Sequence, residues 1–207
     1  NVKETYLMAL LSNRDLQNVT QQIVKEDAFK QEAKQIVQKD VEAIHKQFLK
    51  SFDSHPVTLE IEGGAMATNI SKTLGGIGNL FTYIGFEAGS NPIAPLRRLL
   101  EFYQIHFHPR KNYMSVRIEV PTKEEVFAST PMPWATGRSW ARGIERGISG
   151  LGQYLVKSSR IAKSKSGFAI QTDAPVRGGR FSNTSYMSAL LNAYYKEIEK
   201  LEKKTFS

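Results

Sequence analysis

Three arginines at a four-residue spacing are the side chains of this chain best suited to bind a partner. Arg138, Arg142 and Arg146 stand at i, i+4 and i+8. In a helix this spacing places three guanidinium groups on one face, where they can follow a row of phosphates or match an acidic protein surface. A basic face that is solvated and has no partner is the alternative interpretation of the same pattern.

Glycines interrupt this arginine segment and leave its conformation open. Gly143, Gly147 and Gly150 follow within the same stretch, and each glycine inside a helix costs about 1 kcal/mol relative to alanine. Close approach of another backbone would explain them, and so would an extended segment that is not helical.

The excess positive charge of the chain is concentrated in the same region. Residues 1–133 contain 15 basic and 15 acidic residues, whereas residues 134–180 contain nine and two, within a chain of net charge +8. The Ser-rich part of this region predicts an exposed loop that can contact nucleic-acid backbones through charge, although it lacks interleaved aromatics for base stacking. The predicted interface residues are Trp134, Arg138, Trp140, Arg142, Arg146, Lys157, Arg160, Lys163, Lys165, Arg177 and Arg180.

Both tryptophans of the chain lie at the start of this region. Trp134 and Trp140 belong to the sequence PMPWATGRSW. Burial in the core is the default interpretation of such residues. The functional alternative is a rigid anchor at a subunit boundary, where Trp and Arg are enriched.

Glycine-rich and histidine motifs do not predict a cofactor or metal site. Residues 75–79 (GGIGN) lack the Lys-Ser/Thr of a phosphate loop and predict a flexible turn. His106 and His108 would face the same side of a strand, but no third ligand is near them in the sequence, so we interpret them as surface or packing residues. The absence of cysteine excludes thiol nucleophiles and disulfides.

Paired carboxylates do not predict catalysis either. Glu60 with Glu62, and Glu124 with Glu125, have no partner placed across a cleft, so we interpret them as solvated strand or turn residues. We therefore expect a protein that is not an enzyme and that uses no cofactor.

Periodicity predicts an α+β fold in which a long N-terminal helix and a C-terminal helix pack on a mainly antiparallel sheet. Apolar residues at helical spacing predict helices over 20–52, 92–103 and 184–203, the first ended by His55-Pro56. Alternating or β-rich segments predict strands at 57–61, 78–86, 114–120 and 167–172. The Gly-rich connections 63–78 and 85–90 predict loops that are mobile or ordered by a partner.

Length and composition predict one globular domain over 1–207, with a basic Gly/Arg/Ser-rich extended segment at about 134–182. Apolar residues make up 41% and charged residues 23%, which is globular rather than disordered composition. No apolar run approaches the roughly 18 residues that span a bilayer, and the start lacks a signal-peptide pattern. We expect a protein without membrane contact that is made and used without export.

The segment around Thr136-Gly137-Arg138 resembles a known family. In the sequence PWATGRSW (133–140), it is similar to the Thr-Gly-Arg-apolar segment of the neck and tail-completion proteins of tailed bacteriophages. The closing helix after Asn183 also resembles the C-terminal helix of that family. The chain differs from the family pattern in Trp140, where a leucine is usual, and in the long basic segment that follows.

The resemblance implies a noncatalytic structural protein of the virion, assembled in the host cytoplasm as a subunit of a homo-oligomeric ring in the head-tail connector. It implies further partners in neighbouring portal, connector or tail proteins, and DNA in the channel. The long helix and the 78–89 segment are the expected lateral faces of such a ring, and the basic 138–180 segment is the expected surface for an acidic neighbour or DNA. The alternative function is a basic nucleic-acid-binding module that contacts phosphates.

Overall fold

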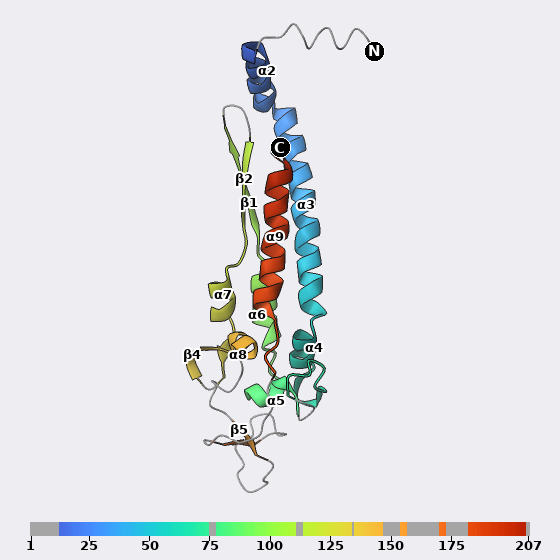
Figure 1. The fold of residues 1–207 in the computed structure, drawn as a ribbon, viewed down its shortest axis with the longest axis vertical. Helices are drawn as coiled ribbons and strands as arrows, with labels where there is room; N and C mark the ends of the chain where they lie inside the picture. Colours follow the sequence, from blue (N-terminus) through green and yellow to red (C-terminus); the bar gives the residue numbers. More distant parts are fainter. Residues whose placement is uncertain are drawn as a thin grey trace. The chain divides into compact units, whose positions relative to one another are not determined.

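The computed structural model describes residues 13–74, 78–110, 114–133, 135–146, 154–156, 170–172 and 182–205. Its helices are α2 (Asn13–Lys25), α3 (Asp27–Asp53), α4 (Pro56–Glu62), α5 (Leu80–Ile84), α6 (Ile93–Leu100), α7 (Lys123–Ala128), α8 (Trp140–Arg146) and α9 (Met187–Thr205), with a 3-10 turn at Gly64–Met66 (Figure 1). The chain forms two compact units. The first contains Asn1–Ile44, Gln104–Glu119 and Ile198–Ser207, and the second contains His45–Tyr103 and Val120–Glu197.

The predicted α+β class is confirmed, with a long N-terminal helix, a C-terminal helix and antiparallel strands. Among the described residues the strands form three separate pairs: β1 (Gln104–Pro109) with β2 (Met114–Glu119), β3 (Pro131–Met132) with β4 (Ala135–Ser139), and β5 (Tyr154–Val156) with β6 (Ile170–Thr172). The predicted strands at 114–120 and 167–172 correspond to β2 and β6, and residues 167–169 lie outside the described part of the chain. The prediction of a single domain stays a prediction.

The long helix begins later than its sequence pattern predicts. The expected helix over 20–52 corresponds to α3, which starts at Asp27, whereas residues 20–25 belong to the separate helix α2. The end of α3 is confirmed, because His55 and Pro56 start a new helix: Pro56 is the first residue of α4, and His55 Nδ1 accepts the Val57 N–H at 3.2 Å. The predicted helices over 92–103 and 184–203 are confirmed as α6 and α9.

Two segments predicted as strands are helices. The alternation at 57–61 lies in α4, where Val57 and Ile61 are buried and Leu59 is exposed. Residues four apart share a helical face, so a short alternating run fits a helix as well as a strand. The segment 78–86 contains α5, which Asn79 caps by accepting the Thr82 N–H at 2.9 Å.

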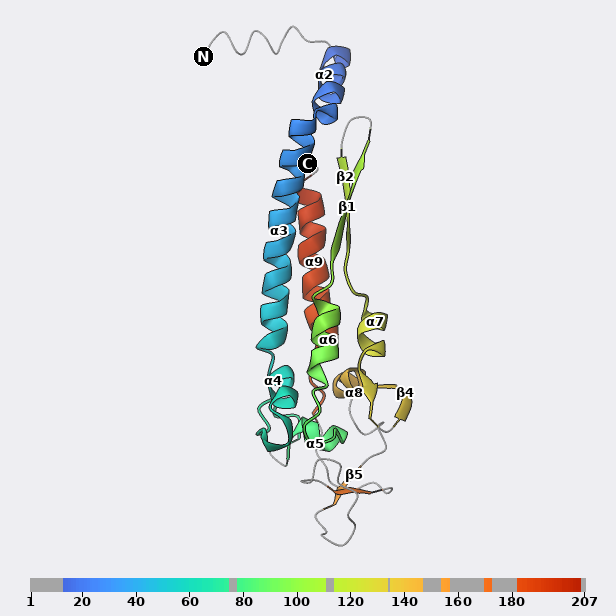
Figure 2. The ribbon, with the colours of Figure 1, turned by 180° about the vertical axis from the view of Figure 1, so that it is seen from behind.

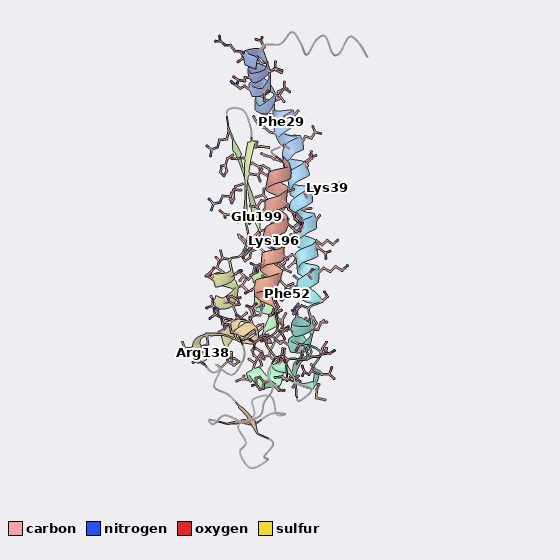
Figure 3. The ribbon with its side chains drawn as sticks, in the orientation of Figure 1. Phe29, Lys39, Phe52, Arg138, Lys196 and Glu199 are labelled. Atoms are coloured by element: carbon pink, nitrogen blue, oxygen red, sulfur yellow. The ribbon has the colours of Figure 1, made fainter. Side chains whose placement is uncertain are left out.

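The core of the second unit is built around Tyr186. Its ring is fully buried, with ring centroids 4.9 Å from His55, 6.3 Å from Trp140 and 6.4 Å from Phe52 at the end of α3 (Figure 3). Its hydroxyl forms a hydrogen bond of 2.9 Å with Thr58 Oγ1. Because its hydroxyl keeps a hydrogen bond, the Tyr186 side chain can be fully buried. It therefore packs α3, α4 and α8 against the start of α9.

A buried carboxylate holds the chain that follows α4. Glu60, expected to be solvated, is fully buried. Its Oε1 accepts the Leu80 N–H and its Oε2 accepts the Ser71 N–H, both at 2.7 Å. The sequence interpretation of Glu60 is therefore wrong, because two backbone donors far along the chain draw its carboxylate inward.

The Asn79 side chain adds a second tie to the same loop. Its amide group donates to the carbonyl oxygens of Ala65 and Ala67 at 3.0 and 2.8 Å. The 63–78 connection was expected to be mobile or ordered by a partner. Its residues 63–74 are instead held by hydrogen bonds within the protein itself. Residues 75–77 lie outside the described part of the chain.

The first unit combines helix and hairpin. Val37 and Val41 of α3 and Leu201 of α9 are buried, and β1 and β2 pair with Phe107 opposite Val116. The Lys34 ammonium group lies 5.6 Å from the centre of the Phe107 ring, which is within cation-π range.

Replacing Glu60 by alanine tests the tie after α4. The change leaves the Ser71 and Leu80 N–H groups without their acceptor, and each unsatisfied buried donor costs about 1–3 kcal/mol. We expect the free energy of unfolding in urea to fall by roughly 2–4 kcal/mol. Glu62→Ala, at an exposed position of the same helix, is the matched control and should change stability by less than about 0.5 kcal/mol. Equal effects of the two substitutions would contradict this role.

A second prediction concerns the buried histidines. Burial lowers the pKa of both His45 and His55, so the unfolded chain takes up protons before the folded protein as the pH falls through about 6.5. The free energy of unfolding should therefore decrease between pH 7.5 and 5.5. His45→Gln keeps a polar partner for the Tyr194 hydroxyl, 3.0 Å from His45 Nδ1, and should reduce this pH difference in urea titrations. An unchanged difference in both His45→Gln and His55→Gln would exclude the histidines as its cause.

Candidate functional site

Arginines from two elements line a hollow of about 640 Å³ in the second unit. The hollow lies among α7, β3, β4 and α8, and its lining includes Arg138, Arg142 and Arg146. All three residues predicted from their spacing thus meet at one place. They do not form one helical face, because Arg138 lies on β4 (Figure 3) and only Arg142 and Arg146 lie on α8.

Gly137 prevents α8 from extending back through the Thr136-Gly137-Arg138 segment. Its φ of +74° lies in the left-handed region, which a right-handed helix excludes. The helix starts after Ser139, whose hydroxyl accepts the Arg142 N–H at 3.1 Å in the manner of an N-terminal cap. The same hydroxyl forms a 2.6 Å bond with Thr130 Oγ1, and the Trp140 N–H donates to the Thr130 carbonyl at 2.8 Å.

Arg142 is the most enclosed of the three arginines. Its guanidinium carbon lies 4.5 Å from the centre of the Phe127 ring, a cation-π arrangement. Its Nε–H is buried and has no hydrogen-bond partner among the described residues. Because buried donors are rarely left unsatisfied, this group is suited to an acceptor supplied by a partner.

The lining carries an excess of positive charge. Glu124 is the acidic residue that lines the hollow with the three arginines. Glu145, although it belongs to α8, accepts hydrogen bonds from the Ser188 N–H and hydroxyl at the start of α9. Gly143 is buried in α8 and also lines the hollow. Of Gly143, Gly147 and Gly150, whose conformation the sequence left open, Gly143 therefore lies in a helix.

Trp140 belongs to the core and not to the interface. Its side chain is 1% exposed, and its ring meets the Phe86 ring edge-on at 5.9 Å. Its place in the predicted interface is therefore wrong, because stacking near Tyr186 turns the indole inward. The other predicted tryptophan, Trp134, lies outside the described residues.

All six remaining basic residues of the predicted interface lie outside the described part of the chain. These residues are Lys157, Arg160, Lys163, Lys165, Arg177 and Arg180. Gly147 and Gly150 also lie outside the described part of the chain. Within the same region β5 and β6 pair with Tyr154 opposite Thr172.

The two histidines of β1 face the same side, as predicted. Their rings are 6.4 Å apart and nearly parallel. His106 Nε2 is 3.4 Å from a carboxylate oxygen of Glu119, whose other oxygen lies 3.2 Å from Arg117. Among the residues that the structure describes, no group of three or more His, Asp or Glu side chains is placed to hold a metal.

An exposed apolar surface on α4 and its following loop was not predicted. We call Leu59, Glu62, Met66 and Ile70 the α4 patch; the apolar members are 42%, 77% and 48% exposed, and Glu62 is also exposed. The alternation at 57–61 predicted a strand in which Leu59 shares the buried face of Val57 and Ile61. A helix over the same residues places Leu59 on the opposite face from Val57 and Ile61.

Much of one expected lateral face, the 78–89 segment, is part of the core, whereas its residues 87–89 are exposed. In the 78–89 segment, Leu80, Phe81, Ile84 and Phe86 are all buried. The aromatic residues of this segment pack inward because the short helix α5 turns them toward the core. The long helix does expose apolar side chains, with Phe29 38% and Ile36 54% exposed (Figure 3).

Comparisons with known proteins give no relative for this chain: no family model, no curated protein and no solved structure matches it. None of the helices in the described ranges has the length and apolar character needed to cross a bilayer.

Proposed function

We propose that this chain is a noncatalytic structural protein of a tailed-phage virion, a ring-forming subunit of the head-tail connector in the neck, tail-completion or tail-terminator position. The observation that carries the proposal is the place of the Thr136–Trp140 segment, on which the family resemblance rests. Arg138 of this segment lines the arginine hollow, and Trp140 anchors the hollow to the core. One short segment thus supplies both a recognition surface and its structural support.

The surfaces of the second unit fit such a subunit. A ring needs two different contact surfaces on each subunit, because each copy meets one neighbour on either side through heterologous contacts. The arginine hollow and the α4 patch differ in shape and in chemistry. The α+β class, with its two long terminal helices, also agrees with what the resemblance implies.

The ring prediction is tested by mass and by imaging. We expect native mass spectrometry and negative-stain electron microscopy to find a closed ring of one stoichiometry, either for the chain alone or after mixing with portal, connector and tail proteins. A chain that remains monomeric at every salt concentration and with each of these components would overturn the proposal.

Nucleic-acid binding is the second candidate, favoured by the convergence of three arginines at one hollow. If phosphates occupy the hollow, the logarithm of the association constant for duplex DNA should fall steeply with the logarithm of salt concentration, by about 0.9 per phosphate contact. Arg138→Ala with Arg146→Ala should lower that slope by about 2. Lys39→Ala with Lys196→Ala, exposed lysines of α3 and α9 (Figure 3), is the control with equal charge loss. Absence of DNA binding at low salt would remove this candidate.

A further inference from the structure

We propose that the arginine hollow of one copy receives the α4 patch of a second copy of this chain. The proposal rests on the ring function proposed above and names the contact by which neighbouring subunits would join. Both surfaces belong to the second unit, so the contact is defined by residues within that unit.

The α4 patch is an ordered surface that exposes apolar side chains to water. Glu60 and Asn79 hold the loop that carries it, through backbone bonds of 2.7 to 3.0 Å. A side chain as exposed as Met66, at 77%, contributes little to the fold of its own subunit. Apolar side chains that stay exposed along one ordered segment, from Leu59 to Ile70, are suited to a docking contact.

The elements that carry the patch and those that line the hollow lie on opposite sides of helix α6. Helix α6 contacts both α4 and α7. In both views α4 lies on one side of α6, whereas α7, β4 and α8 lie on the other (Figures 1 and 2). A subunit therefore cannot place its own patch in its own hollow, but a neighbour can, and each further copy can repeat the contact heterologously.

The two surfaces are complementary in charge. The hollow presents three arginines and one glutamate, and the patch presents the Glu62 carboxylate among apolar side chains. A guanidinium group binds a carboxylate through two parallel hydrogen bonds. The buried Nε–H of Arg142, without a partner among the described residues, is a donor suited to that carboxylate.

The surfaces also match in their apolar parts. Phe127, Ala128 and Pro131 line the hollow beside the arginines. A methionine adapts to irregular apolar gaps and makes favourable contacts with aromatic rings, so Met66 suits a wall that contains Phe127. A phosphate backbone would use the arginines but would leave the exposed apolar residues of the α4 patch without a role.

Cross-linking can test the contact directly, because the chain contains no cysteine. Thr68→Cys, an exposed position between Met66 and Ile70, and Ala128→Cys, an exposed position in the hollow's lining, keep Glu62 and the arginines in place. Chains with these substitutions and different tags are coexpressed and treated with a short bis-maleimide. We expect a cross-linked pair containing one chain of each kind, no pair from either variant alone, and a ladder of multimers from the doubly substituted chain. Lys39→Cys with Ala128→Cys is the control and should give no pair.

A second variant measures the apolar part of the contact. Met66→Asp should weaken self-association at least tenfold in analytical ultracentrifugation, while the urea midpoint of the isolated chain stays unchanged because this side chain is exposed. Met66→Leu should preserve association. An equal loss with both substitutions would argue against an apolar contact at this position.

The outcomes separate the contact from the ring function. Rings without a mixed Thr68→Cys and Ala128→Cys pair would overturn this contact and leave the ring proposal standing, whereas a persistent monomer would overturn both. Pairs formed only between identical variants would show an isologous contact and would also overturn the proposal. Protection of Ala128→Cys from maleimide by duplex DNA, without mixed pairs, would assign the hollow to nucleic acid instead.

Discussion

The burial of Tyr186 is the constraint on which the second unit depends. Its ring lies near Phe52 and Trp140, and its hydroxyl is satisfied by Thr58, so the removal of a large aromatic side chain from water is not opposed by a lost hydrogen bond. Burial also raises the pKa of the Tyr186 hydroxyl, which therefore stays a neutral hydrogen-bonding group. Because Trp140 is the first residue of α8, this core contact fixes the helix that carries two arginines of the hollow.

The sequence predicted elements best where one periodicity extended over many residues. The apolar stripes of α3 and α9 identified those helices correctly, because long runs fit only one period. Short runs did not: five alternating residues at 57–61 fit both a strand and α4. What decides between them is Glu60, whose partners at Ser71 and Leu80 lie 11 and 20 residues away, and no local pattern reports such contacts.

The sequence selected the three arginines that line the hollow but not the geometry that brings them together. Spacing selected Arg138, Arg142 and Arg146, and all three line the hollow, yet the positive φ of Gly137 places the first on a strand. A glycine directly before a predicted helical arginine was the local signal of this break. The interior position of Trp140 depends on rings distant in the sequence, and the α4 patch depends on a loop closed by Asn79.

The environment of Arg142 favours a protein partner over a phosphate track. Its guanidinium lies against Phe127 and its Nε is buried, so a bond formed there is less screened by solvent and salt than one at an exposed lysine. Nonspecific DNA binding depends instead on accessible charges that follow the backbone and are sensitive to salt. A partly desolvated arginine beside an aromatic ring is typical of the centre of a protein interface, where Arg and aromatic residues are enriched. Within the basic region, Arg142 is therefore the residue best suited to a specific contact. An acidic side chain held by a folded partner would satisfy its buried Nε–H.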